Sequence, residues 1–146
     1  MIQRIQSIFL LLAGAAGLTQ PAVDFATVPT AVAGSALFAD AQYDVFDSMG
    51  LLIPFLAGGA LAVVAIFLFN NRKNQLLVSR FAFLAYLVGI VLTVILYLRD
   101  AVYQGTATPD DGVGLYLPVV GLVLLILAMR YITKDDKLVR SSNRLR

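Results

Sequence analysis

The sequence predicts an all-α membrane protein, an antiparallel bundle of four transmembrane helices formed by residues 1–146 as a single domain. Composition is the first reason, because 60% of the 146 residues are hydrophobic and only 14% are charged. A soluble domain of this size and composition would have too few polar side chains to cover its surface. The other two reasons are long apolar runs and basic residues that gather between alternate runs.

Three apolar runs are long enough to cross a bilayer. A spanning helix needs about 20 mostly apolar residues, because the hydrocarbon layer is about 30 Å thick and each helical residue rises about 1.5 Å. Residues 50–69 and 81–98 contain no charged side chain, and residues 113–132 contain only Arg130. We expect each of these runs to form a transmembrane helix.

The fourth run, about residues 5–21, is shorter and has two interpretations. It resembles a signal peptide, with Ala13-Gly14-Ala15 as a small-residue cleavage site. It also fits a retained helix, because the run can extend to Pro21 and so reach a thin spanning length. We favour the retained helix.

The connections between the runs differ in kind. Residues 22–49 form a long outer loop, whose alternating apolar positions are compatible with a short hairpin. Residues 70–80 form a short polar linker, and residues 99–112 form a turn-rich loop. Residues 133–146 form a charged tail.

The basic residues predict the orientation of the helices. All but one of the eleven fall on one side of the four-helix arrangement, and Arg99 alone falls on the other. The ten on the shared side are Arg4, Arg72, Lys73, Arg80, Arg130, Lys134, Lys137, Arg140, Arg144 and Arg146. Because lysine and arginine accumulate on the cytoplasmic side, we expect a multi-pass protein of the cell membrane with both termini in the cytoplasm.

The sequence offers little to catalysis or to metal binding. It has no His and no Cys, which excludes His/Cys metal sites, thiol nucleophiles and disulfides. Ion and proton pathways need ionisable or amide groups at membrane depth, and the second to fourth runs lack such groups there, which disfavours a pump or a proton-coupled transporter. We expect the Thr93 hydroxyl to donate to a backbone carbonyl of its own helix. Asp40, Asp44 and Asp47 lie in the outer loop, and their carboxylate oxygens could bind Ca²⁺. We favour the alternative, in which these three side chains are solvated. We predict no catalytic residue, cofactor or metal.

Small residues recur four positions apart in three of the runs. The pairs are Ala13 with Gly17, Gly58 with Ala62, and Ala85 with Gly89. Such pairs let helix backbones approach closely. They predict either a dimer face or packing within this bundle, and we favour packing within the bundle.

The tail presents a cluster of cations to the cytoplasmic membrane surface. Its candidate docking residues are Lys134, Lys137, Arg140, Arg144 and Arg146. Cations beside a bilayer attract anionic lipid, so the first interpretation is contact with lipid, and the second is a docking site for a protein partner. We expect no nucleic-acid binding, because no aromatic stacking platform accompanies the charges.

Three segments resemble a known family. Met1–Ser7, the linker Asn71-Arg72-Lys73 and above all the ending Lys134–Arg146 resemble an uncharacterised family of small four-pass membrane proteins, a domain of unknown function from bacteria of the Bacteroidetes type. The likeness covers essentially the whole chain. It implies four retained helices and a bacterial inner membrane, and it implies no activity or substrate.

These observations lead to three hypotheses about function. The leading one is a non-enzymatic accessory or scaffold subunit of a membrane complex, with a membrane-protein partner. The alternative is a carrier or binder of lipid or another apolar small molecule, which would need a lateral cleft between helices. A membrane enzyme that uses the outer Asp residues is the least favoured hypothesis.

Overall fold

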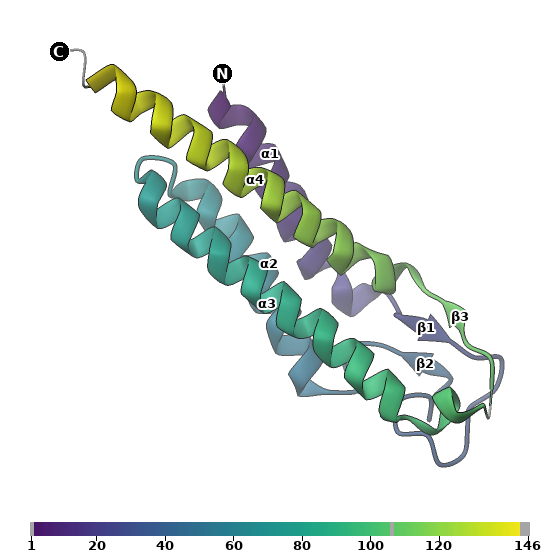
Figure 1. The fold of residues 1–146 in the computed structure, drawn as a ribbon. Helices are drawn as coiled ribbons and strands as arrows, with labels where there is room; N and C mark the ends of the chain where they lie inside the picture. Colours follow the sequence, from purple (N-terminus) through teal and green to yellow (C-terminus); the bar gives the residue numbers. More distant parts are fainter. Residues whose placement is uncertain (1, 106, 144–146) are drawn as a thin grey trace.

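Four helices form an antiparallel bundle in the computed structural model, which describes residues 2–105 and 107–143. They are α1 (Ile2–Leu18), α2 (Met49–Phe67), α3 (Arg72–Arg99) and α4 (Val113–Asn143). Each helix packs against two neighbours, in the order in which the helices follow along the chain (Figure 1). The start of α1, the α2–α3 turn and the end of α4 lie at one end, which we call the basic end (Figure 1).

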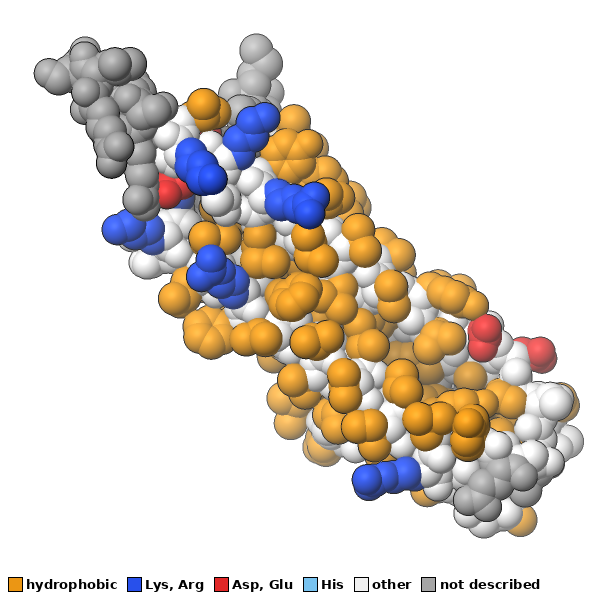
Figure 2. Space-filling model, viewed as in Figure 1, with side chains coloured by type: hydrophobic (Ala, Val, Ile, Leu, Met, Phe, Trp, Pro, Cys, Tyr) orange, Lys and Arg blue, Asp and Glu red, His pale blue; other side chains and the backbone are white. Residues whose placement is uncertain are grey.

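Three of the helices are long and apolar enough to cross a membrane: α2, α3 and the Val113–Val139 part of α4. The apolar part of α1, Ile5–Leu18, is shorter. Large hydrophobic side chains are exposed along the bundle, and they form a broad apolar band between the basic end and the opposite end (Figure 2). Water does not favour such a surface, so these features are those of a membrane protein.

Two helices are longer than we expected. α3 begins at Arg72 and not at residue 81, because Asn71 caps it by accepting a hydrogen bond from the Asn74 amide at 3.2 Å. Gln75 and Ser79 are fully buried, so the expected polar linker is in fact the amphipathic start of a helix. The expected tail is also helical, since α4 continues without interruption to Asn143.

A small cap covers the other end of the bundle, and the all-α prediction needs correction there. The cap contains an antiparallel sheet of β1 (Ala26–Thr27), β2 (Gln42–Tyr43) and β3 (Asp110–Asp111) in the order β2-β1-β3. The β1–β2 pair agrees with the hairpin considered for residues 22–49, whereas β3 was not expected. Both β3 side chains are exposed, so no apolar alternation marked this strand in the sequence.

The chain enters the cap where α1 stops. α1 was expected to reach residue 21, but it ends at Leu18, and a 3₁₀ turn (Gln20–Ala22) with Pro21 near its start follows. Proline has no amide hydrogen to continue the α-helical pattern.

An aromatic cluster joins the cap to the bundle. Phe25 lies 5.1 Å from Tyr43 and 5.8 Å from Phe55 of α2, measured between ring centroids. The Tyr43 hydroxyl donates to the Thr93 carbonyl of α3 at 2.9 Å. Since the three rings are almost completely buried, the cap and the helices share one hydrophobic core.

Tyr86 is the large side chain at the centre of the bundle. It is fully buried on α3, and its hydroxyl donates to the Ala13 carbonyl of α1. Gly58 of α2 and Gly121 of α4 leave room for its ring, because a Cβ at either position would lie within 2.7 Å of a ring atom. All four helices therefore meet around one aromatic ring.

Candidate functional site

The seam between α3 and α4 is where the bundle surface is hollowed. These two helices make the least extensive contact of the four neighbouring pairs. Within the described residues, grooves of about 450 and 230 Å³ lie along the seam near the basic end, and grooves of about 140 and 210 Å³ lie near the cap. Each groove is lined by both helices, so the seam provides lateral openings at both ends.

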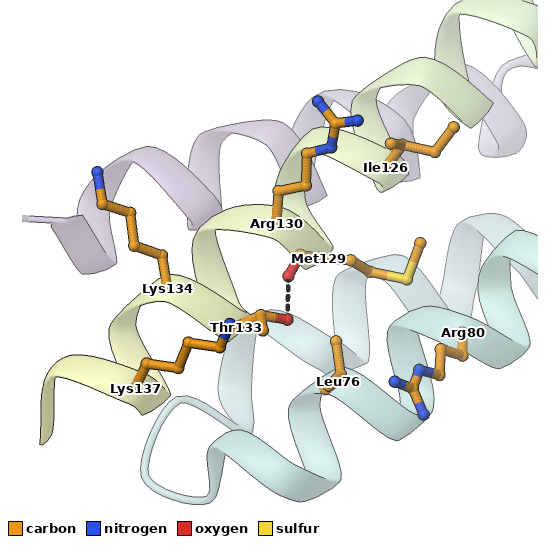
Figure 3. Close-up of a pocket in the computed structure, with 8 residues that line it drawn as sticks. All are labelled: Leu76, Arg80, Ile126, Met129, Arg130, Thr133, Lys134 and Lys137. Atoms are coloured by element: carbon orange, nitrogen blue, oxygen red, sulfur yellow. Dashed lines mark hydrogen bonds between the residues drawn. The ribbon is translucent and has the colours of Figure 1, made fainter. Parts of the chain in front are cut away.

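The groove of about 450 Å³, which we call the basic groove, combines cations with apolar side chains. It is lined by Leu76, Arg80, Ile126, Met129, Arg130, Thr133, Lys134 and Lys137. The α4 members recur at helical spacing, so they form one stripe along that helix. The stripe changes from apolar at Ile126 and Met129 to cationic at Lys134 and Lys137 (Figure 3).

The cations lie on both sides of the seam. In Figure 3, Arg80 projects from α3, while Arg130 and Lys134 project from the side of α4 that faces away from α3. The Thr133 hydroxyl donates to the Met129 carbonyl at 2.8 Å and so satisfies its own hydrogen within α4. Every charged side chain in the described lining of the groove is a cation.

The adjoining groove of about 230 Å³ differs in charge. It shares Leu76, Arg80 and Thr133 with the basic groove, but Asp136 also lines it. Among the described side chains, the basic groove has no acidic member and the adjoining groove has this one. The basic groove is the better of the two for an anion.

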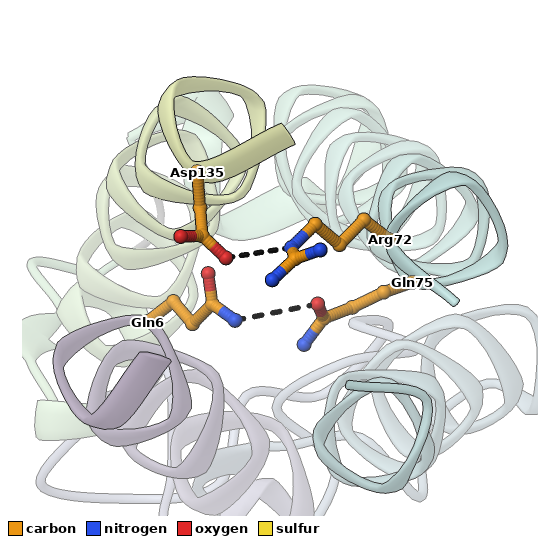
Figure 4. A network of polar contacts seen from close by, with 4 residues as sticks. All are labelled: Gln6, Arg72, Gln75 and Asp135. Carbon is orange, nitrogen blue, oxygen red and sulfur yellow. Dashed lines mark hydrogen bonds and ion pairs between the residues drawn. The ribbon is translucent and has the colours of Figure 1, made fainter. Parts of the chain in front are cut away.

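A buried polar network lies beside these grooves (Figure 4). Gln6 of α1 donates from Nε2 to Gln75 Oε1 of α3 at 3.4 Å, and Arg72 Nε donates to Asp135 Oδ2 of α4 at 2.6 Å. Gln6 Oε1 and Gln75 Nε2 are buried without a hydrogen-bond partner among the described residues. The network joins α1, α3 and α4 at the basic end.

The ion pair also marks where α4 passes the start of α3. Arg72 is the first residue of α3, and it pairs with Asp135, so residues 136–143 of α4 continue beyond the start of α3 (Figure 1). At a rise of about 1.5 Å per residue this α4 extension is about 12 Å long. Leu138 and Val139 are exposed on it. A helix with exposed apolar side chains thus projects from the basic end.

The structure brings two of the five candidate docking residues into the basic groove, namely Lys134 and Lys137. Arg140 lies on the α4 extension, where its backbone alone is described, and Arg144 and Arg146 lie outside the described residues. Sequence reasoning missed Arg80 and Arg130 as site residues. The spacing of Ile126, Arg130 and Lys134 by four could have indicated a stripe on α4, but only the fold places Arg80 opposite it.

The small residues singled out in the sequence lie at contacts inside the bundle. Ala13 and Ala62 are fully buried. A Cβ at Gly17 would meet the Phe55 carbonyl oxygen at 2.8 Å. Gly58 and Gly89 are also buried, and Ala85 is half-buried. Five of these six positions are thus buried within the chain.

The outer acidic residues serve the turns of the cap. Asp40 Oδ1 accepts from the Gln42 amide, Asp44 Oδ1 from the Phe46 amide, and Asp47 Oδ2 from the Asp44 amide. These are local bonds of the kind that shape turns. No group of three or more metal-ligating side chains occurs among the residues that the structure describes.

A family model described as "Domain of unknown function (DUF4293)" matches residues 2–145. No curated protein and no solved structure matches the chain.

Proposed function

The chain belongs to the family of this domain of unknown function (DUF4293), and from its geometry we propose that it is a non-enzymatic accessory or scaffold subunit of a membrane complex. The α4 extension is the observation that best supports this function. It continues past the start of α3 as a regular helix, and the Arg72–Asp135 pair anchors its base. Exposed Leu138 and Val139 next to Lys137 give a partner both apolar and charged contacts.

We propose that the protein resides in a bacterial inner membrane, crosses it four times and has both termini in the cytoplasm. The cations support this orientation. Arg99 is the last residue of α3, next to the cap, whereas Figure 2 shows most of the Lys and Arg side chains on the visible face clustered at the basic end. The members of that cluster whose side chains are described are Arg72, Lys73, Arg80, Arg130, Lys134 and Lys137.

Single cysteines test the orientation, since the sequence has none of its own. Asn70 in the α2–α3 turn and Thr30 in the cap are both exposed. In cells whose outer membrane has been permeabilised and whose inner membrane is intact, a membrane-impermeant maleimide should label Thr30→Cys. It should label Asn70→Cys only after the cells are lysed. The reverse pattern would overturn the orientation.

Copurification in mild detergent tests the subunit role. We expect a partner to accompany the wild-type chain and to be lost when Leu138→Ser and Val139→Ser are combined. Phe46→Ser with Met49→Ser is the matched control, because it removes two exposed apolar side chains at the cap end and should retain the partner. A wild-type chain that always elutes alone, or a partner kept by the α4-extension variant, contradicts the proposal.

Lipid binding is the second candidate function, and the lateral grooves between α3 and α4 favour it. The groove of about 210 Å³ near the cap is lined mainly by apolar side chains, among them Ile90, Val94 and Val119. An acyl chain fits such a surface because it buries apolar area. After gel filtration in detergent, the protein should retain about one lipid per chain by extraction and mass spectrometry. Folded protein that carries no lipid after this mild step, and takes up none when lipid is added back, would contradict this function.

A further inference from the structure

We propose that the basic groove binds one anionic phospholipid, with the lipid phosphate among the cations and an acyl chain along the apolar part of the seam. The inference rests on the second candidate function and specifies its ligand and its place. The cations are Arg80, Arg130, Lys134 and Lys137, and the apolar side chains are Leu76, Ile126 and Met129.

Charge is the first argument for an anionic ligand. Four cations line one groove with no carboxylate in its lining. The Arg72–Asp135 ion pair uses none of these four cations, and Asp136 lines the adjoining groove. Like charges that line one groove repel one another, and a bound anion reduces that repulsion. A phosphate group provides that anion and accepts several hydrogen bonds.

The order of side chains along α4 is the second argument. From Ile126 to Lys134 the stripe passes from apolar to cationic within about 12 Å of helix, at about 1.5 Å per residue. A phospholipid has the same order along its length, since its acyl chain adjoins its charged head group. The cationic part of the stripe lies beyond Met129, towards the basic end of α4. Basic pockets between helices at a membrane surface are suited to such head groups.

The lateral opening of the seam is the third argument, and it distinguishes a lipid from free phosphate. Ile126 is exposed on α4, while Leu76 and Met129 are half-buried at the floor of the groove. A free phosphate would leave these apolar side chains uncovered. A lipid that enters from the side covers them, with its phosphate at the cationic part of the groove.

Native mass spectrometry of the purified full-length chain tests the proposal. Delipidated protein in a non-ionic detergent is titrated with phosphatidylglycerol, phosphatidylcholine or inorganic phosphate. We expect one phosphatidylglycerol to bind about tenfold more tightly than phosphatidylcholine. Inorganic phosphate should not displace it at equal concentration, because phosphate makes no contact with the apolar side chains.

Two pairs of variants separate the groove from general surface charge. Arg80→Gln with Arg130→Gln should weaken phosphatidylglycerol binding by up to about tenfold, which corresponds to about 1.4 kcal/mol and removes its preference over phosphatidylcholine, whose binding should change little. Lys73→Gln with Arg99→Gln removes the same charge outside the basic groove and should bind as the wild type does. Helical circular dichroism confirms that each variant is folded.

Each possible outcome decides between the claims. Equal binding of the two lipids by the wild type, or an equal loss in both variant pairs, overturns the anionic site while lipid binding itself stands. Displacement by equimolar inorganic phosphate overturns the phospholipid as the ligand. If neither lipid binds to folded protein, both this inference and the second candidate function are wrong.

Discussion

The Ser35 hydroxyl donates to the Asp100 carboxylate at 2.7 Å, although the two residues are 65 positions apart. The same carboxylate accepts from the backbone amides of Ala36, Leu37 and Val102 at 3.0–3.2 Å. Asp100 follows the last residue of α3 and is only 6% exposed. One buried carboxylate thus holds the long loop of the cap against the end of a helix.

Asp100→Asn should loosen the cap while leaving the bundle folded. An asparagine keeps one acceptor oxygen, so about two of the hydrogen bonds to a charged group are lost, at a cost of about 2–4 kcal/mol. We expect proteolysis between Val28 and Gln42 of the purified protein to become at least tenfold faster. Asp110→Asn is the control, because Asp110 is an exposed carboxylate of the same cap. Equal cleavage of the two variants would show that Asp100 does not hold the loop.

The cap should be most stable near pH 4. Burial alone would raise the pKa of Asp100, but hydrogen bonds from Val102, Ser35, Leu37 and Ala36 outweigh it and hold the pKa below its usual value. Its stabilisation is therefore complete above about pH 4 and is lost as the pH falls through the lowered pKa. Burial, together with the charges of nearby carboxylates, raises the pKa of Asp47 to about 6. Its stabilisation is present below about pH 4 and is lost as the pH rises to about 6.

Hydrogen exchange of cap peptides, corrected for intrinsic rates, measures this dependence. Protection should decline on both sides of pH 4. Asp47→Asn should remove the decline above pH 4, and Asp100→Asn should remove the decline below it. Protection that rises steadily from pH 4 to pH 6 in the wild type would contradict the prediction.

The long helices could be predicted from the sequence because bilayer thickness imposes a length that hydropathy records directly. Residues 50–69, 81–98 and 113–132 all fall within helices of the structure, apart from the last two residues of the first run. The start of α3 could not be found in this way. Its first turns are polar, and their buried face consists of Gln75 and Ser79, which a search for apolar runs does not detect.

The candidate site combines residues from different helices, and the sequence alone does not show which of them lie close together in the fold. Lys134 and Lys137 were identified as membrane-facing cations from the tail alone. The basic groove also needs Arg80, which lies on another helix, and its position opposite α4 follows from the Arg72–Asp135 register. Strand β3 depends on backbone pairing with β1, and its two exposed aspartates carry no pattern of their own.

Gly17→Ala should weaken the packing of α1 against α2 and α3. An added Cβ would lie 2.8 Å from the Phe55 carbonyl oxygen and 2.5 Å from the Tyr86 hydroxyl. The backbone oxygen cannot move away without a shift of α2, and overpacking of this kind costs about 1–3 kcal/mol. We expect a lower midpoint of thermal unfolding in detergent, followed by circular dichroism.

Gly50→Ala is the matched control for Gly17→Ala. It adds the same methyl group in the first turn of α2, where the nearest atom is the flexible Ser48 hydroxyl at 3.3 Å. Since alanine favours helix over glycine by about 1 kcal/mol, this variant should be as stable as the wild type or more stable. Equal midpoints for Gly17→Ala and the wild type would show that α1 and α2 can separate at little cost.

The Arg72–Asp135 pair should contribute a measurable coupling energy to the position of α4. The two side chains are 21% and 13% exposed, so water screens them only in part, and loss of one partner leaves a poorly solvated charge. We expect Arg72→Ala or Asp135→Ala to cost about 1–2 kcal/mol each, and the double variant to cost about 1 kcal/mol less than their sum. Exchange of the charges, with Arg72→Asp and Asp135→Arg combined, should recover part of the loss.

Hydrogen exchange should become faster in residues 136–143 of each single variant, because the base of the α4 extension is then no longer held. Lys73→Ala, which removes an exposed neighbouring cation, should change neither quantity, and additive costs in the double variant would mean that the two residues act independently.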